Sequence, residues 1–308
     1  MGISNEDITI NDNFADGNNA EITEMMVNDT HDNIPQTAPD VAQGIINFNE
    51  FLADPTPESF KSEFLTVYIE DETALTHAIR TQNVKAVQLF IEAGADANGI
   101  NKKNVTPIGA AAHRGNVDII QLLVNAGAVT NALNGSGSTA LIQAAHFGHV
   151  EAVRLLIKNH ATADYANLKG TTALMRASQE GHLEICKELI SAGADVNKKN
   201  HEGMNALMFA SQRGHAEITL LLVKNGAAMN EQTSQGSTAL MLACKRGNRG
   251  CVDVLVSTGA EIFMTNSRGH TARDTALRRQ HNDLLEILDT QVQVRKIEED
   301  RYTSAFNG

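Results

Sequence analysis

The sequence predicts an all-α fold, a solenoid of stacked helix–turn–helix units with projecting β-hairpin loops. A threonine or asparagine recurs every 33 residues, an alanine follows it by five residues, and in the five internal units a glycine follows it by nine. Periods of this length are typical of solenoids, in which a single unit cannot bury its apolar face alone. The threonine and asparagine anchors are Thr73, Thr106, Thr139, Thr172, Asn205, Thr238 and Thr271.

Each repeated position has a physical reason in the first helix of a unit. Threonine and asparagine cap helices by accepting the free N–H groups of the first turn, and Pro107 follows Thr106 at a position where its missing donor costs nothing. The small alanine lets neighbouring helices approach closely, since a larger side chain would overpack the contact. The glycine ends the helix with a positive φ, and Gln82 and Gln280 replace it in the two terminal units.

The second half of each unit predicts an apolar helix and then a polar loop. The helix closes with a second glycine such as Gly127, which His160 replaces once. About ten polar residues follow, and a further glycine such as Gly137 lies two residues before the next anchor. Asn104 replaces that glycine once, and asparagine is the best substitute for glycine in a left-handed turn.

From about residue 71 to residue 290 the chain resembles the ankyrin repeat family in seven consecutive units. The clearest matches to the family signature are Thr106-Pro107-Ile108, Gly181-His182, and Gly193-Ala194-Asp195-Val196-Asn197. The resemblance implies a non-enzymatic module that binds other proteins through a concave groove and its hairpin tips. It covers about three-quarters of the chain.

Two departures from the family signature affect packing and turns. The histidine that normally follows Thr-Pro-Leu is absent, so apolar packing by methionines must compensate for its hydrogen bonds. Its position holds Thr76, Gly109, Ile142, Met175, Met208, Met241 and Asp274. The aspartate of the hairpin tip is mostly asparagine, which can still make the local side-chain-to-backbone turn: Asn101, Asn134, Asn167, Asn200 and Asn266, with Thr233 as the exception.

The two ends of the chain differ from the repeats. Residues 1–70 contain 14 acidic residues and one basic residue, whereas residues 71–308 are nearly neutral. We expect residues 1–40 to form a disordered acidic tail. We expect residues 41–70 to form a helical N-terminal cap, with a second helix opening at Thr56. Residues 291–308 should form a C-terminal cap helix and tail, with the last outer helix running from about Asn282 to near Arg301.

The sequence offers little chemistry for catalysis, so we expect no enzymatic activity, cofactor or metal. The glycine-rich run Asn134–Gly137 lacks the spacing and the lysine of a phosphate-binding loop. His113 and His146 occupy equivalent positions in neighbouring units, so their backbones should lie too far apart to converge easily on one zinc ion. Cys244 and Cys251 have no metal-binding company and suggest buried thiols.

One surface stands out from this background. Two positions before the turn glycine, and a third one turn earlier on the same helix face, should line the concave side in the family that the chain resembles. These positions are basic over repeats five to seven and include two phenylalanines, and arginine and aromatic residues are enriched in protein interfaces. We predict a partner-binding surface, the inner-helix stripe, formed by His113, Arg114, His146, Phe147, Arg176, Gln179, Phe209, Gln212, Arg213, Lys245, Arg246, Arg278 and Arg279.

The expected function is that of a monomeric scaffold or adaptor that binds a protein with an acidic or mixed surface. Nucleic-acid binding along the same basic stripe is a disfavoured alternative, because the repeat region has a net charge of only about +1. A further alternative is an inhibitor or regulator in which the acidic tail folds back over the stripe. The stripe could also be an ordinary solvated face without a partner.

The remaining features indicate a protein of the cytoplasm, with the nucleus as an alternative. No apolar run approaches the length of a membrane span, and no signal peptide is visible at the N-terminus. The three cysteines suggest no disulfide framework, which favours a reducing compartment.

Overall fold

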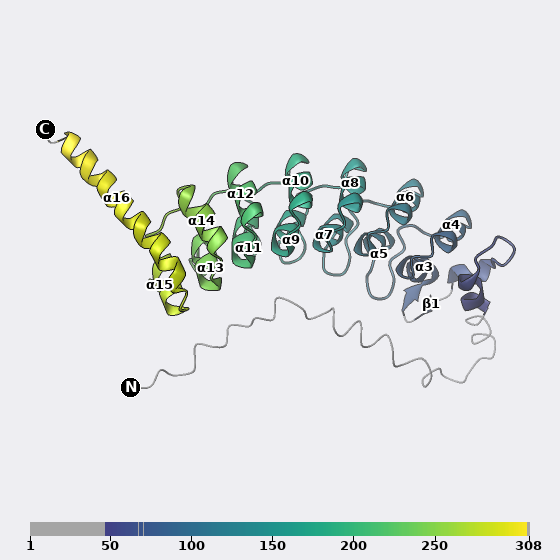
Figure 1. Cartoon of the computed structure of the whole chain (residues 1–308). Helices are drawn as coiled ribbons and strands as arrows, with labels where there is room; N and C mark the ends of the chain where they lie inside the picture. The colour runs from purple at the N-terminus through teal and green to yellow at the C-terminus, as the bar shows by residue number, and fades with distance from the viewer. Residues whose placement is uncertain (1–46, 67, 70, 307–308) are drawn as a thin grey trace, which may run out of the picture. The chain divides into compact units, whose positions relative to one another are not determined.

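In the computed structural model, inner and outer helices alternate along the chain and form two rows (Figure 1). It describes residues 47–66, 68–69 and 71–306, so the expected acidic tail lies outside the described residues. The inner row consists of α3 (Ala74–Arg80), α5 (Pro107–Arg114), α7 (Ala140–His146), α9 (Ala173–Glu180), α11 (Ala206–Arg213), α13 (Ala239–Arg246) and α15 (Ala272–Arg278). The outer row consists of α4 (Val84–Glu92), α6 (Val117–Asn125), α8 (Val150–Lys158), α10 (Leu183–Ser191), α12 (Ala216–Lys224), α14 (Arg249–Ser257) and α16 (Leu285–Phe306). The predicted all-α solenoid of stacked helix pairs is confirmed.

The repeated anchors cap the inner helices as the sequence predicts. In each inner helix the anchor side chain accepts a hydrogen bond from the backbone N–H three residues later, at 3.0 to 3.3 Å. At the start of α15, Asp274 also accepts from the backbone N–H of Thr271, which completes a capping box. The turn glycines that end the internal inner helices have φ values between 68° and 88°. Each inner helix therefore begins at a capping side chain, and each of the five internal ones ends at or beside a glycine with positive φ.

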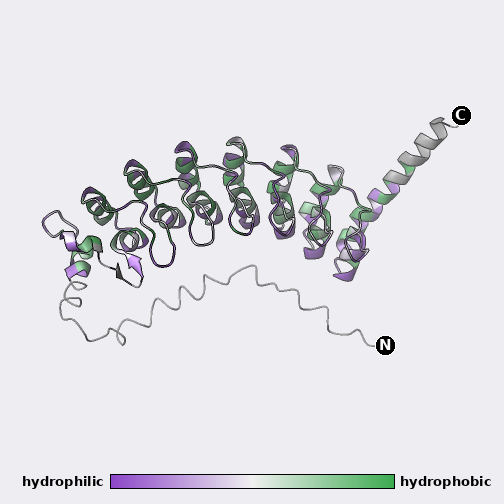
Figure 2. Cartoon of the chain, turned by 180° about the vertical axis from the view of Figure 1, so that it is seen from behind, coloured by the Kyte–Doolittle hydropathy of each residue, from purple (hydrophilic) through white to green (hydrophobic). Residues whose placement is uncertain are grey.

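The core lies between the two rows and between successive layers, where apolar residues are concentrated (Figure 2). All seven repeated alanines are completely buried: Ala78, Ala111, Ala144, Ala177, Ala210, Ala243 and Ala276. At the position of the missing family histidine, Ile142, Met175, Met208 and Met241 are at most 3% exposed. Apolar packing thus replaces the hydrogen bonds of that histidine.

The loops between repeats are tight turns fastened by one side chain each. The Oδ1 atom of Asn134 accepts hydrogen bonds from the backbone N–H groups of Ser136 and Ser138, at 3.0 and 2.9 Å. Neighbouring loops are also bonded to each other, for example from the N–H of Leu168 to the carbonyl of Ser136 at 3.1 Å. Because the asparagine side chain takes over part of the bonding, strand pairing in these loops is shorter than the expected β-hairpins.

Strand pairing is clearest at the start of the first repeat. There, β1 (Tyr68–Ile69) and β2 (Glu72–Thr73) pair antiparallel, with Tyr68 opposite Thr73. Among the described loops between repeats, an isolated bridge joins Ala166 and Thr172. The fold is therefore helical with only traces of strand.

The described part of the N-terminal segment packs on the first repeat through aromatic rings. Residues 47–53 are helical. Phe48 and Phe51, both buried, lie with their ring centroids 6.0 and 5.6 Å from that of Phe90 on α4. Phe64 lies 5.5 Å from Phe48. The open apolar face of the first layer is thus buried by phenylalanines, a residue type that is scarce in the remainder of the chain.

The helix expected to open at Thr56 does not form. Residues 56–59 make a turn, and the 3-10 helix η2 (Ser62–Thr66) follows. The hydroxyl of Ser59 bonds to the backbone N–H of Thr56 and to the carbonyls of Asp54 and Thr56, at 3.0 to 3.3 Å. Such local side-chain bonds compete with helix formation and explain the difference.

The last outer helix begins later and ends later than expected. Residues Asn282–Leu284 form the 3-10 turn η3, and α16 continues from Leu285 to Phe306. Leu284 and Leu288 are buried against the last layers, whereas Val294 and Ile297 are 40% and 54% exposed. The first turns of α16 therefore complete the last layer, and its described distal side chains become exposed.

Non-glycine residues occupy left-handed positions where the repeat pattern calls for glycine. Asn104 has a φ of 55°, as the sequence predicts, and Gln82 and Gln280 have φ values of 57° and 62°. His160 has a φ of 64° in the slot that other repeats fill with glycine. A left-handed non-glycine residue costs on the order of 1–3 kcal/mol.

We predict that His160→Gly raises the free energy of unfolding by about 1 kcal/mol, since relief of strain exceeds the entropic cost of glycine. A Cβ at the equivalent Gly127 or Gly193 would meet no atom within 4 Å, so the backbone conformation alone decides the effect. Urea denaturation of His160→Gly and His160→Ala measures it, because alanine keeps the Cβ and the strain. Equal stabilities of the two variants would contradict the prediction.

Candidate partner-binding surface

The structure places most of the predicted inner-helix stripe at the ends of consecutive inner helices, with Arg176 and Phe209 one turn earlier on α9 (Ala173–Glu180) and α11 (Ala206–Arg213). His113 and Arg114 end α5, Phe147 is the C-cap of α7, and Arg279 is the C-cap of α15. Exposure varies along the stripe. Arg114, Arg213, Arg246, Arg278 and Arg279 are exposed. The half-buried members are His113, His146, Phe147, Arg176, Phe209, Gln212 and Lys245.

Gln179 departs from the prediction, because it is only 7% exposed. Its Oε1 accepts a hydrogen bond from Nη1 of Arg176 at 3.3 Å. Gln179 therefore supports another member of the stripe and offers little surface of its own. Gln179 is buried because its amide side chain bonds to Arg176, one turn earlier on α9, and does not extend into solvent.

Side chains from the outer row hold the ends of the inner helices in place. The Nε2 atoms of His149, His182 and His215 lie 3.0 to 3.1 Å from the carbonyl oxygens of residues 113, 146 and 179 in the preceding repeat. In the next repeat, Nδ2 of Asn248 donates to the carbonyls of Ser211 and Gln212 at 2.8 and 2.9 Å. These bonds satisfy carbonyls that a helix end leaves free. They give the histidines after the turn glycine a structural role, and they hold the backbone of the stripe in place.

A cluster of rings joins repeats two and three on the stripe. The ring centroids of His113 and Phe147 are 4.0 Å apart, and those of Phe147 and His146 are 4.6 Å apart. Burial lowers the pKa of His113, and the charge of Arg114 lowers it further. Burial likewise lowers the pKa of His146, with Arg176 adding to the effect and Glu180 opposing it. Near neutral pH both imidazoles are therefore mainly uncharged, and this part of the stripe is aromatic in character.

Arg176 lies beside this cluster on α9. Burial lowers the pKa of its guanidinium, and Glu180 opposes the shift. Glu180 itself lies 3.6 Å from Nδ1 of His146, which is beyond hydrogen-bond distance. One guanidinium, one carboxylate and a largely neutral imidazole therefore lie close together at this point of the stripe.

A second set of surface residues was missed by the sequence analysis. Large apolar side chains are exposed in the loops that precede α5, α7 and α9: Ile100, Val129, Leu133, Tyr165 and Leu168, at 39% to 71%. At the position of Ile100 and Leu133, later repeats carry Lys199 and Gln232. This change from apolar to polar residues at one loop position is the sequence feature that could have indicated the exposed apolar loops. Exposed apolar groups in neighbouring layers are typical of interaction surfaces.

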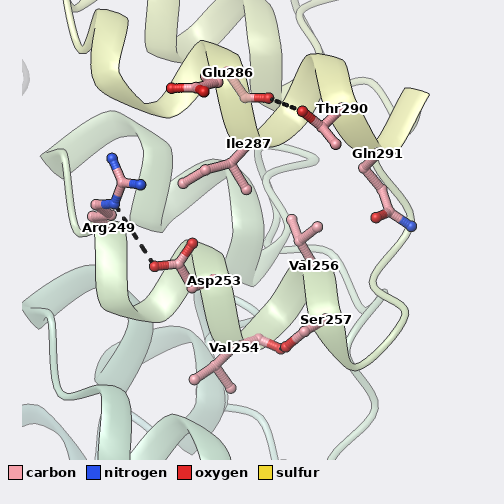
Figure 3. Close-up of a pocket in the computed structure, with 9 residues that line it drawn as sticks. All are labelled: Arg249, Asp253, Val254, Val256, Ser257, Glu286, Ile287, Thr290 and Gln291. Carbon is pink, nitrogen blue, oxygen red and sulfur yellow. Dashed lines mark hydrogen bonds and ion pairs between the residues drawn. The ribbon is translucent and has the colours of Figure 1, made fainter. Parts of the chain in front are cut away.

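A hollow of about 550 Å³ lies between α14 and α16 on the outer row (Figure 3). Val254, Val256 and Ile287 provide its apolar lining. Arg249 and Asp253 stand at its edge with Nε and Oδ2 3.9 Å apart. The hollow includes no residue of the inner-helix stripe, so it is a separate feature of the outer row.

The thiols of the chain are buried in the core. Burial raises the pKa of Cys186 to about 11 and that of Cys244 to about 12, and it also raises the pKa of Cys251. Such thiols stay protonated and are weak nucleophiles and ligands. In the part of the chain that the structure describes, histidine, cysteine and carboxylate side chains form no group of three that could hold a metal ion. Nor does any helix there combine the length and apolar character needed to cross a membrane.

Stacked helix pairs with a regular interior and a varied surface define a class of repeat proteins. Matches to the family model for ankyrin repeats, in three copies, span residues 41–134, 109–200 and 207–296. The chain belongs to the ankyrin repeat family. Ankyrin repeats typically mediate protein–protein interactions, and proteins of this family are usually non-catalytic. No match was found among curated proteins.

We predict that His113 and His146 make the protein less stable in acid. Their folded pKa values lie below the ordinary value of 6.5, so the unfolded chain binds more protons as the pH falls through 6.5. The stability they support is present above pH 6.5 and is lost below it. Thermal unfolding at pH 7.5 and 5.5 should show a smaller acid loss for the double variant His113→Gln, His146→Gln. His160→Gln, at an exposed site, is the control, and an unchanged acid loss in the double variant would refute the assignment.

Proposed function

We propose that this chain is a non-enzymatic scaffold or adaptor that binds another protein through the inner-helix stripe and the loop tips. The observation that carries the proposal is the repetition of exposed guanidinium groups at the ends of three consecutive inner helices, α11, α13 and α15. Arg213, Arg246, Arg278 and Arg279 supply them. Arginine combines a broad apolar surface with five donors, which makes it frequent in the centre of interfaces.

The stripe changes character along the stack, and this supports a protein partner. Repeats two to four contribute the ring cluster and most of the exposed apolar loop residues, whereas repeats five to seven contribute most of the exposed arginines. Interfaces between proteins commonly combine apolar anchors with charged groups that steer association. A nucleic-acid backbone would favour basic groups along its whole length. The proposed partner therefore presents an acidic surface to the last three repeats.

Charge reversal tests the proposal. We expect the variant Arg213→Glu, Arg246→Glu, Arg278→Glu, Arg279→Glu to lose the protein partner that the full chain captures, with affinity reduced at least about a hundredfold. The matched control reverses four exposed lysines of the outer row: Lys85, Lys158, Lys187 and Lys224. Affinity capture followed by binding measurements with the purified partner compares the two.

Two results would contradict the proposal. One is equal loss of the partner in both variants, which would indicate a general effect of charge. The other is loss of RNA or DNA from the stripe variant, which would replace the protein partner by nucleic acid. Regulation by the acidic N-terminal segment remains a prediction, because residues 1–46 lie outside the described residues.

A further inference from the structure

We infer that Arg176 is a receptor for one carboxylate, and that the partner segment seated on it carries an aspartate or glutamate between apolar side chains. The inference rests on the proposed function and names the chemistry of the partner at the middle of the inner-helix stripe. It concerns α7, α9 and α11, which lie in consecutive layers (Figure 1).

Arg176 is a half-buried cation whose direct partner is neutral. Its Nη1 donates to the amide oxygen of Gln179 at 3.3 Å. Glu180 acts on it through space, but no carboxylate among the described residues forms an ion pair with it within 4.0 Å. Removing part of a charged group from water without such a partner is unfavourable. The free protein therefore contains a guanidinium whose pairing is incomplete.

A carboxylate is the group that completes this pairing best. The planar guanidinium can bind both oxygens of a carboxylate through parallel hydrogen bonds. The surrounding charges favour a single negative charge, because Glu180 already lies beside His146 and acts on Arg176. A doubly charged phosphate would be repelled more strongly by that carboxylate. We therefore assign a carboxylate to this position.

Aromatic side chains flank Arg176 along the stack. Phe209 occupies the equivalent position in the next repeat and is half-buried. Phe147 lies in the preceding repeat, in contact with the rings of His113 and His146. Layers of packed helices are about 8–10 Å apart, and a chain in the polyproline II conformation advances about 3.1 Å per residue with three residues per turn. Side chains three residues apart therefore lie on the same side of such a segment, about 9 Å from each other. The partner segment thus takes this conformation and places an apolar side chain about three residues before and after its acidic residue.

A peptide selection tests the inference. A displayed library of random 12-residue peptides is selected on the full chain, and enriched peptides are synthesised for fluorescence anisotropy. We expect an aspartate or glutamate at one fixed position with apolar residues on both sides. Changing that residue to asparagine or glutamine should weaken binding at least about tenfold. In the variant Arg176→Gln the same peptide change should have no effect.

Stability measurements separate a binding role from a structural one. If pairing of Arg176 is incomplete, Arg176→Met should leave the melting temperature of the free protein unchanged or raise it, while binding of the enriched peptides falls. Arg176→Lys keeps the charge but loses the two-point geometry, so its affinity should lie between those of the parent and Arg176→Gln. A lower melting temperature of Arg176→Met would overturn the inference.

The outcomes also distinguish this inference from the proposed function. Enriched peptides without an acidic residue, peptides that require a phosphate, or equal binding to Arg176→Gln would overturn the Arg176 assignment. If those peptides were still lost by the fourfold arginine-to-glutamate variant, the proposed function would survive. Failure to enrich any peptide, or binding unaffected by both variants, would overturn both.

Discussion

The close approach of neighbouring inner helices is the constraint on which the structure depends. Each inner helix carries one alanine of the repeated position, and all seven alanines are completely buried. A larger side chain at any one of them would force two layers apart, because protein interiors have little space for extra atoms. The 33-residue period is the length of chain needed to form one layer and return to this contact. Stacking then produces one continuous apolar interior.

The same contact determines where function can lie. With the inner helices in register, a side chain at the start of α8, α10, α12 and α14 reaches a carbonyl at the end of the inner helix of the preceding repeat, as His149 does with residue 113. The C-terminal ends of the inner helices are therefore held at regular positions along the stack, and the side chains beside them form most of the inner-helix stripe. Residues such as Phe147 and Arg176 are half-buried because side chains of neighbouring layers cover part of their surface. The position of the stripe is thus a consequence of the packing.

Features that recur in every repeat could be predicted from the sequence. The caps, the turn glycines and the replacement of the family histidine by Met175, Met208 and Met241 all follow from chemistry repeated at a fixed spacing. Features that occur once were harder to predict. The turn at residues 56–59 depends on the hydroxyl of Ser59, and the late start of α16 depends on η3. The burial of Gln179 and the exposure of Leu168 depend on contacts that no single position in the sequence reveals.

Hydrogen–deuterium exchange of the full chain, with and without its captured partner, tests most directly whether the inner row is the binding face. A partner on the inner-helix stripe protects the last turns of α7, α9, α11 and α13 and leaves exchange in α8, α10 and α12 unchanged. Protection confined to the outer helices, or to the hollow between α14 and α16, would contradict the assignment of function to the inner row.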